Sequence, residues 1–239
     1  MKKIEKNENQ VVFTAEINET LANSIRRYIN QIPVLALDEV EISKNDSALY
    51  DETIAHRLGL IPLKDEKTSE KKPGKLSLNI KREGLVYSGD LKGHPAVVYK
   101  NIPITTLSGD QELQLSATVR AGKGAEHSKF SPGLMFYRNV SEITLDKEFY
   151  EEIKRMLPDA EIKEKGQKII IIDNKKIEVA DVCGGIADKK KKKAETEKKD
   201  ELVVTVESFG QMPPGEIFVK SIEALKKDLA SLEKSVDKI

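Results

Sequence analysis

Tryptophan is absent from this 239-residue chain, cysteine occurs once, and aromatic residues make up only 5%. The single cysteine, Cys183, excludes an internal disulfide and any site that needs several thiolates. Such sparing use of cysteine is typical of a reducing compartment, so we expect a cytoplasmic protein. No apolar run approaches the length of a membrane span, and the first ten residues hold no apolar secretion signal.

Net charge is missing as well, because Lys+Arg and Asp+Glu each number 40. A protein that neutralises many phosphates by itself usually carries a basic excess. We therefore expect contact with nucleic acid only indirectly, through partner chains. The lysine run Lys189–Lys193 stands out from this balance, and we interpret it as a solvated loop.

The common catalytic motifs are also lacking. The glycine-rich stretch 121–128 does not end in the Lys-Ser/Thr of a phosphate-binding loop, and no Gly-x-Ser-x-Gly elbow is present. The histidines His56, His94 and His127 are scattered without metal-ligand spacing. We expect no catalytic residue, no metal ligand and no independent active site.

What the sequence does contain is a helix with a broad apolar face, over residues 20–33. Its apolar residues recur at helical spacing, and they are Leu21, Ile25, Tyr28, Ile29 and Ile32. Pro33 ends this helix, because a proline disfavours helical geometry in the residue before it. Arg26 and Arg27 lie on the flank of the apolar face. An apolar face beside a permanent charge pair indicates a docking surface.

A second long helix begins near Pro213 and Pro214. Its apolar residues follow steps of four and three, and they are Phe218, Ile222, Leu225, Leu229, Leu232, Val236 and Ile239. This spacing is typical of a narrow coiled-coil seam. Two interpretations stay open: the helix packs on its own sheet, or it lies across a subunit interface.

The remaining pattern predicts an α+β fold. Predicted strands cover 11–17, 34–42, 75–80, 84–91, 94–99 and 112–119, and predicted helices cover 51–58 and 146–157. The second of these helices has Asp146 as its N-cap and stops at Pro158. Residues 64–74 are polar and predict a loop. Residues 168–179 predict a β-hairpin that turns at Asp173 and Asn174.

Four segments, in order, resemble the alpha-type subunits of multisubunit RNA polymerases, above all the archaeal members of that family. Residues 20–42 resemble the assembly motif of the family, and residues 50–63 its following helix. Residues 206–229 are similar to the closing segment and dimerisation helix. Residues 121–138 resemble a second signature, whose turn residues would be Gly122, Gly124, His127, Lys129 and Pro132.

The resemblance implies an architecture. Residues 1–46 and 203–239 would form a discontinuous dimerisation domain, and residues 47–145 an inserted β-rich domain. Residues 146–202 would form a degenerate ferredoxin-like insertion with a lysine-rich loop. An iron–sulfur cluster needs about four thiolates, so we expect no cofactor and a cluster-free remnant. Its core would be Phe149, Ile153, Leu157 and the strand Ile169–Ile172.

The resemblance also implies a function. The chain would be a non-catalytic assembly subunit of DNA-directed RNA polymerase, a nucleotidyltransferase complex, that pairs with subunit L. The heterodimer would scaffold the large catalytic subunits for transcription, together with subunits N and P. Arg26 and Arg27 would dock a large subunit, and the surface for subunit L would be Leu21, Ile25, Tyr28, Phe218, Ile222, Leu225, Leu229 and Leu232. Two alternatives are a stand-alone ferredoxin-like redox or interaction protein and a bacterial-alpha-like homodimer.

Overall fold

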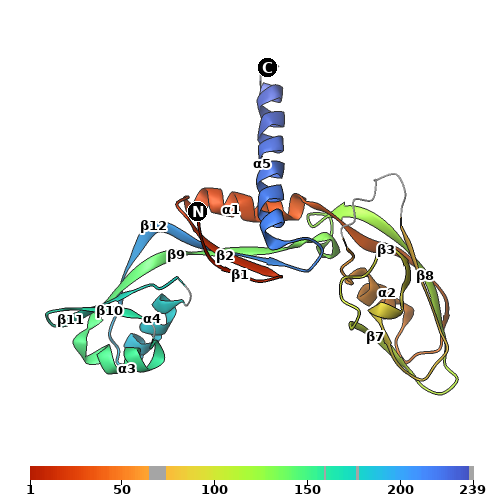
Figure 1. Ribbon diagram of the computed structural model, residues 1–239, viewed down its shortest axis with the longest axis horizontal. Coiled ribbons are helices and arrows are strands. Elements are labelled where there is room, and N and C mark those ends of the chain that lie inside the picture. The colour runs from red at the N-terminus through yellow and green to blue at the C-terminus, as the bar shows by residue number, and fades with distance from the viewer. Residues whose placement is uncertain (65–73, 159, 176–177, 237–239) are drawn as a thin grey trace. The chain divides into compact units, whose positions relative to one another are not determined.

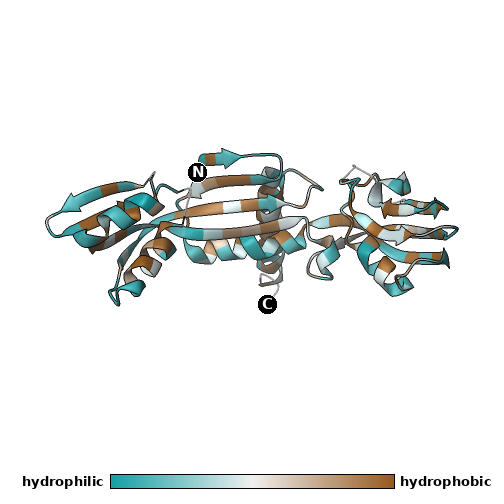
Figure 2. Ribbon diagram, turned by 90° about the horizontal axis from the view of Figure 1, so that it is seen from below, coloured by the Kyte–Doolittle hydropathy of each residue, from teal (hydrophilic) through white to brown (hydrophobic). Residues whose placement is uncertain are grey.

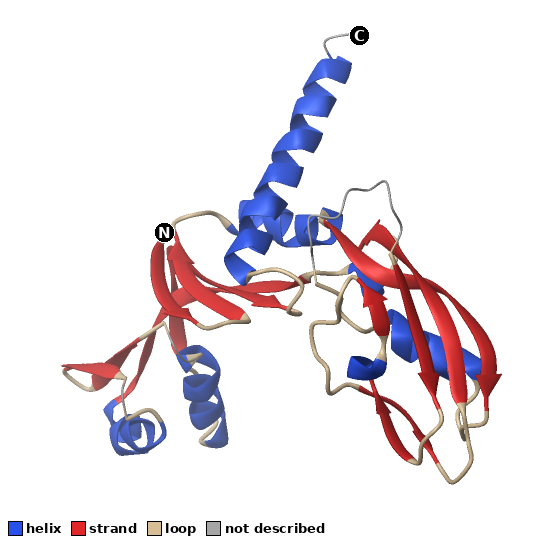
Figure 3. Ribbon diagram, turned by 45° about the vertical axis from the view of Figure 1, so that its right-hand side comes forward, coloured by secondary structure: helices blue, strands red, loops and turns tan. Residues whose placement is uncertain are grey.

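The structure is a computed structural model, and it describes residues 1–64, 74–158, 160–175 and 178–236. The predicted loop between Lys64 and Gly74 and the seam residue Ile239 lie outside the described residues. The chain divides into two compact units: unit 1 is Met1–Asn23 with Met135–Thr205, and unit 2 is Ser24–Leu134 with Val206–Ile239. Helices and sheets occur together in the chain (Figure 3), which confirms the predicted α+β class.

Unit 1 is built on a six-stranded sheet with the order β1-β2-β12-β9-β11-β10. The strands are β1 (Lys2–Lys6), β2 (Gln10–Ala15), β9 (Gly133–Asp146), β10 (Glu161–Lys165), β11 (Lys168–Ile172) and β12 (Glu195–Ser208). The predicted first strand is confirmed as β2. Figure 2 shows apolar stretches within these strands, and in β12 residues 202–206 are all buried without alternation.

The predicted hairpin at Asp173 and Asn174 is wrong. The strands β10 and β11 instead form an antiparallel hairpin, with Lys165 opposite Lys168. Gly166 lies in its turn at φ 62°, a conformation that glycine adopts without a steric penalty. The side chain of Asp173 is buried and paired with Arg138, and the chain continues into a helix, α4 (Val179–Lys189), that the sequence analysis missed.

A small module at one end of this sheet has its own core. The module consists of the 3₁₀ turn η4 (Lys147–Phe149), α3 (Tyr150–Met156), α4 and the strands β9, β10 and β11. Its buried residues are Ile143, Leu145, Phe149, Ile153, Leu157, Ile169, Ile171, Val179, Cys183, Ile186 and Ala187. The predicted cap is wrong, because the Asp146 carboxylate makes no capping bond and instead accepts a 2.7 Å hydrogen bond from Lys192.

Unit 2 contains a four-stranded sheet with the order β3-β8-β4-β6 and a two-stranded sheet of β5 and β7. The strands are β3 (Pro33–Asn45), β4 (Lys75–Ile80), β5 (Gly84–Tyr87), β6 (Lys92–His94), β7 (Pro103–Leu107) and β8 (Leu113–Lys123). The 3₁₀ turn η2 (Ser88–Asp90) follows β5. The helix α2 (Asp51–Gly59) packs against this sheet (Figure 1), with Ile54 and Leu58 fully buried.

One predicted strand of unit 2 is wrong and two strands were missed. The segment 94–99 forms no strand of its own: β6 ends at His94, and Val97 makes a single bridge to Leu63. Pro95 has no N–H to donate to a ladder, which explains the break. The missed strands are β6 and β7, and β7 pairs with β5, with Leu107 opposite Gly84.

Candidate docking surface

The helix α1 (Glu19–Tyr28) combines an apolar face with an exposed arginine pair. Asn18 caps it, because its Oδ1 accepts a 2.8 Å hydrogen bond from the backbone N–H of Leu21. Ile25 is buried, whereas the side chain of Leu21 is 43% exposed. Arg26 and Arg27 are exposed on the last turn, where cations also interact favourably with the helix dipole.

The first half of the helix α5 (Pro214–Val236) packs inside the chain itself. Ile217, Phe218 and Ser221 are buried. Ile222 and Leu225 are half-buried. Of the predicted interface residues, Phe218 and Ile25 therefore lie beneath the surface of the chain.

The second half of α5 is exposed on every side. All residues from 226 to 236 are exposed, and beyond Asp228, which contacts α1, Figure 1 shows no other described element beside this half. Leu229, Leu232 and Val236 are 56%, 62% and 66% exposed, and we call these three the exposed stripe. The first half of the helix fits the interpretation of packing within its own chain, and the interface interpretation of the second half stays a prediction. An isolated helix of this length is marginal in water, and a row of large exposed apolar side chains marks an interface.

Val219, which is 52% exposed, borders the same face and was missed by the sequence analysis. Val219 directly follows the seam residue Phe218, so a pattern restricted to steps of four and three does not include it. Widening the seam to the flanking coiled-coil positions would have found it.

A polar contact joins α1 to α5. The hydroxyl of Tyr28 hydrogen-bonds the carboxylate of Asp228, and desolvation together with this bond raises the pKa of Tyr28 above its ordinary value. Tyr28 is half-buried, so its ring covers apolar surface while its hydroxyl reaches α5. The contact helps to fix where α5 leaves the body of unit 2.

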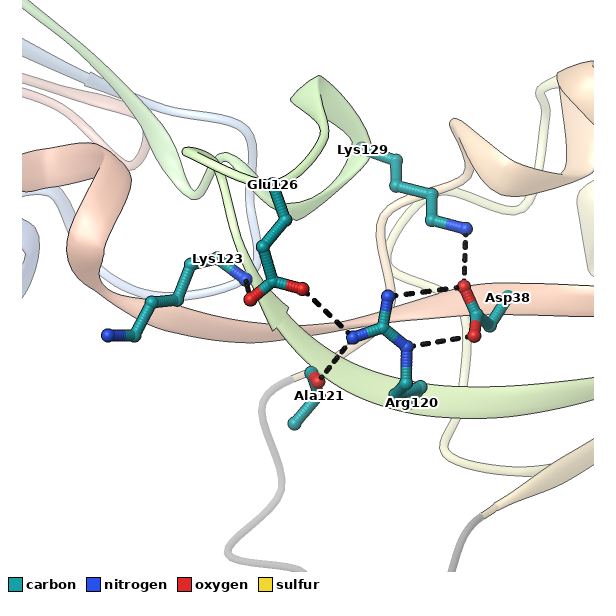
Figure 4. A network of polar contacts seen from close by, with 6 residues as sticks. All are labelled: Asp38, Arg120, Ala121, Lys123, Glu126 and Lys129. Carbon is teal, nitrogen blue, oxygen red and sulfur yellow. Dashed lines mark hydrogen bonds and ion pairs between the residues drawn. The ribbon is translucent and has the colours of Figure 1, made fainter.

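The predicted signature turn surrounds a network of charges on β3 and β8 (Figure 4). Asp38 accepts hydrogen bonds of 2.8 Å from Arg120 Nε and from Lys129 Nζ. Arg120 also donates a 3.1 Å bond to Glu126 Oε2. Asp38 and Arg120 were missed by the sequence analysis. Their signal was weak, because charged residues on exposed strand positions are common.

Gly122 and Phe130 form the apolar part of this turn. A Cβ at Gly122 would lie 2.6 Å from the ring of Phe130, which is completely buried, so a larger residue there displaces the ring. The guanidinium of Arg120 and the ammonium of Lys129 lie 4.7 and 5.0 Å from the ring centroid. The ring of Phe130 thus contacts both the glycine turn and the cations of the charge network.

The other signature residues also have structural partners. His127 Nδ1 accepts a 3.1 Å hydrogen bond from the N–H of Lys129 at the start of the 3₁₀ turn η3 (Ser128–Phe130). The carbonyl of Pro132 accepts a 3.0 Å bond from the N–H of Phe209. Every predicted residue of the signature turn therefore lies in one folded unit with the end of β8. This turn holds strands together, and it places no nucleophile or acid in a cleft.

Replacing Asp38 with asparagine tests the network. Hydrogen bonds from Arg120 and Lys129 hold the pKa of the Asp38 carboxyl below its usual value of 3.8. Because this pKa is lower in the folded than in the unfolded chain, the carboxylate stabilises the fold above about pH 4. That stabilisation disappears as the pH falls through the folded value. We expect Asp38→Asn to lower the free energy of unfolding by about 1 kcal/mol at pH 7, after allowance for solvent screening.

Denaturant unfolding between about pH 7 and about pH 2.5 measures this difference. Asp110→Asn is the matched control, because Asp110 is exposed and sits outside the network. A deficit in Asp38→Asn that stays constant across this range would contradict the electrostatic explanation.

Cys183 lies on α4 within the core of the small module. It is completely buried, and desolvation raises the pKa of its thiol to about 11. The lysine run ends this helix and is not simply a solvated loop. Lys190 lies 4.8 Å from the ring of Phe149, and Lys192 is 2.9 Å from Glu148. At least two of its five lysines therefore contribute to the module itself.

The described part of the chain contains no group of three or more His, Cys, Asp or Glu placed to hold a metal ion. A hollow of about 770 Å³ in unit 1 is lined by the carboxylates of Glu16, Glu19, Asp200 and Glu201. Glu201 is paired with Lys175 at 2.6 Å, and that bond lowers the pKa of its carboxyl. No described helix is long and apolar enough to cross a membrane.

Comparison with known proteins identifies the family to which the chain is similar. Residues 40–136 match the family described as RNA polymerase Rpb3/RpoA insert domain. DNA-directed RNA polymerase subunit Rpo3 of Pyrococcus horikoshii is 38% identical over 184 residues, which cover 69% of this chain and 71% of that protein. For Rpo3 of Methanothermobacter thermautotrophicus, the identity is 30% over 247 residues, and the coverage is 93% of each chain.

Rpo3 of Thermococcus kodakarensis is 38% identical over 168 residues, and this match spans 65% of that protein, just under two thirds. With the α+β fold and the matched insert domain, these similarities confirm the resemblance found in the sequence and connect the chain with transcription. The chain belongs to the family of DNA-directed RNA polymerase subunit Rpo3.

Proposed function

We propose that this chain is a non-catalytic assembly subunit of a DNA-directed RNA polymerase. It forms a heterodimer with a small subunit of the L type, and the heterodimer is the platform on which the large catalytic subunits assemble. Subunits of the N and P type join the same platform. Phosphodiester formation takes place in the large subunits, and this chain holds them in position.

The exposed stripe of α5 is the observation that carries this proposal. Leu229, Leu232 and Val236 have no covering element within the described chain. Covering them is worth on the order of 2 kcal/mol per side chain. Lys226, Asp228 and Glu233 border the stripe and are exposed. An apolar centre with a charged rim is typical of a subunit interface.

The arginine pair of α1 supports the second contact of the platform. Arg26 and Arg27 are exposed at the end of the helix. A guanidinium pairs with carboxylates or carbonyls in a fixed, forked geometry, which suits the docking of a large subunit.

Replacing Arg27 with alanine separates the two contacts. We expect Arg27→Ala to leave the heterodimer intact and to weaken recruitment of the large subunit about 10- to 100-fold, because a charge-assisted hydrogen bond is lost. The measurement is binding of the purified heterodimer to the large subunit. Arg155→Ala is the matched control, since Arg155 is also an exposed arginine on the last turn of a helix, α3. Loss of the heterodimer itself would contradict this division of roles.

The small module is proposed to be free of an iron–sulfur cluster. A cubane cluster needs about four thiolates, and the sequence offers only Cys183. The apolar core around Phe149 and Cys183 takes over the role of holding the module together. Iron analysis of the purified chain tests this, and bound iron at one cluster per chain would favour the redox alternative.

A further inference from the structure

We propose that the signature turn, residues 122–132, is a clamp on the end of α1, and that Asn30 is the positioning residue through which it acts. The clamp fixes the direction in which α1 presents Arg26 and Arg27. This inference rests on the proposed docking role of the arginines. It concerns unit 2 alone, because residues 24–134 all belong to that unit.

Asn30 lies just beyond α1, in the 3₁₀ turn η1 (Ile29–Gln31). Its backbone carbonyl accepts a 3.0 Å hydrogen bond from the N–H of Ala125. Its side-chain amide lies 3.2 Å from the hydroxyl of Ser131, and either orientation of the amide makes a hydrogen bond there. Two bonds from opposite ends of the turn therefore hold one residue at the end of the helix.

Gly124 makes this close approach possible. A Cβ at this position would lie 2.6 Å from Oδ1 and 3.2 Å from Cα of Asn30. The second distance involves backbone, which cannot move aside as a side chain does. An alanine at Gly124 therefore pushes η1 and the turn apart.

The turn is itself rigid, which a clamp requires. Phe130 is completely buried against Gly122, and Asp38 binds both Arg120 and Lys129. The helix that the turn holds, α1, is short, with only ten residues before η1. A shift of η1 is thus passed directly to the last turn of α1, where the arginines lie.

A double-mutant cycle between the turn and the arginine tests the proposal. The purified heterodimer is assayed for large-subunit binding with Gly124→Ala, Arg27→Ala and both changes together. Gly124→Ala alone should weaken binding about 5- to 10-fold, with a clearly smaller loss when Arg27 is already alanine, because only Arg26 is then left to be misplaced. Binding of Gly124→Ala equal to wild type, or an equal loss in both backgrounds, would overturn the proposal. Gly185→Ala is the control, because a Cβ added at Gly185 would meet no atom within 4 Å.

Hydrogen exchange on the same variants separates failure of the clamp from failure of the proposed function. The amide of Ala125 and those of the last turn of α1 should exchange faster in Gly124→Ala and Ser131→Ala, but not in Gly185→Ala. If this holds while Arg27→Ala binds normally, the clamp is supported and only the docking role of the arginine fails. Unchanged exchange in Gly124→Ala would overturn the clamp.

Discussion

Replacing Leu229 with aspartate is expected to abolish the heterodimer. In the free chain this side chain is 56% exposed, so the substitution leaves the fold nearly unaffected. In a complex the carboxylate would lie unpaired in an apolar interface, which costs about 3 to 5 kcal/mol. This loss corresponds to a complex weaker by about 100-fold or more. Pull-down of the small subunit measures the loss of binding. Circular dichroism of the variant checks that its fold is retained.

Lys227→Asp is the control for this experiment. It places the same carboxylate at an exposed position on the opposite side of α5 and also removes a positive charge, so it is the more severe change in charge. We expect it to bind the small subunit as wild type does. Leu225→Asp is a second interface variant, but Leu225 is half-buried in the chain, so its effect mixes folding with binding. If the small subunit binds Leu229→Asp and Leu225→Asp normally, the exposed stripe is not the interface.

Replacing Phe149 with alanine is expected to unfold the small module while the rest of the chain stays folded. The ring is completely buried at the centre of that core, and its loss costs about 3 to 5 kcal/mol. Cys183 is a built-in probe. With a pKa of about 11, its thiol is mostly protonated at about pH 8, and burial blocks reagents as well.

In Phe149→Ala we expect Cys183 to react with a disulfide reagent at least about 100-fold faster, as its pKa returns towards about 8.5. Heterodimer formation should persist, because the exposed stripe lies on α5. Phe136→Ala is the matched control, since Phe136 lies on β9 and is 50% exposed. Equal reactivity of Cys183 in Phe149→Ala and wild type would show that the module does not depend on this core.

The sequence pattern was sufficient where one local signal decides the structure. Helical spacing located α1, although this helix ends at Tyr28 and the 3₁₀ turn η1 occupies residues 29–31 before Pro33. The steps of four and three located α5. The alternation of Leu113, Leu115 and Ala117 against polar residues located β8. For β8 the buried face follows from the sequence period alone.

The predictions failed where a tertiary contact decides the structure. Asp173 and Asn174 have good turn propensity, but Arg138 uses the carboxylate of Asp173, and the turn forms at Gly166 instead. Aspartate is a favoured N-cap residue, but the carboxylate of Asp146 accepts a hydrogen bond from Lys192 instead. The charge network was missed for the same reason, because Asp38 and Arg120 are 82 residues apart in sequence. Local propensity cannot reveal such partners.

The candidate surface was predictable in part. The sequence placed Leu229 and Leu232 on a seam but could not divide α5 into a packed and an exposed half. That division depends on tertiary packing, which the sequence period does not reveal. The predicted domain limits at 46/47, 145/146 and 202/203 stay a prediction. The two compact units meet at other positions, and the strand β9 runs through the second limit without a break.

Native mass spectrometry of the chain co-expressed with a small subunit of the L type tests the central claim most directly. We predict a single complex with one copy of each chain, and poor solubility of this chain when it is expressed alone. A stable homodimer of this chain that excludes the small subunit would contradict the account, and so would a soluble monomer that binds no partner.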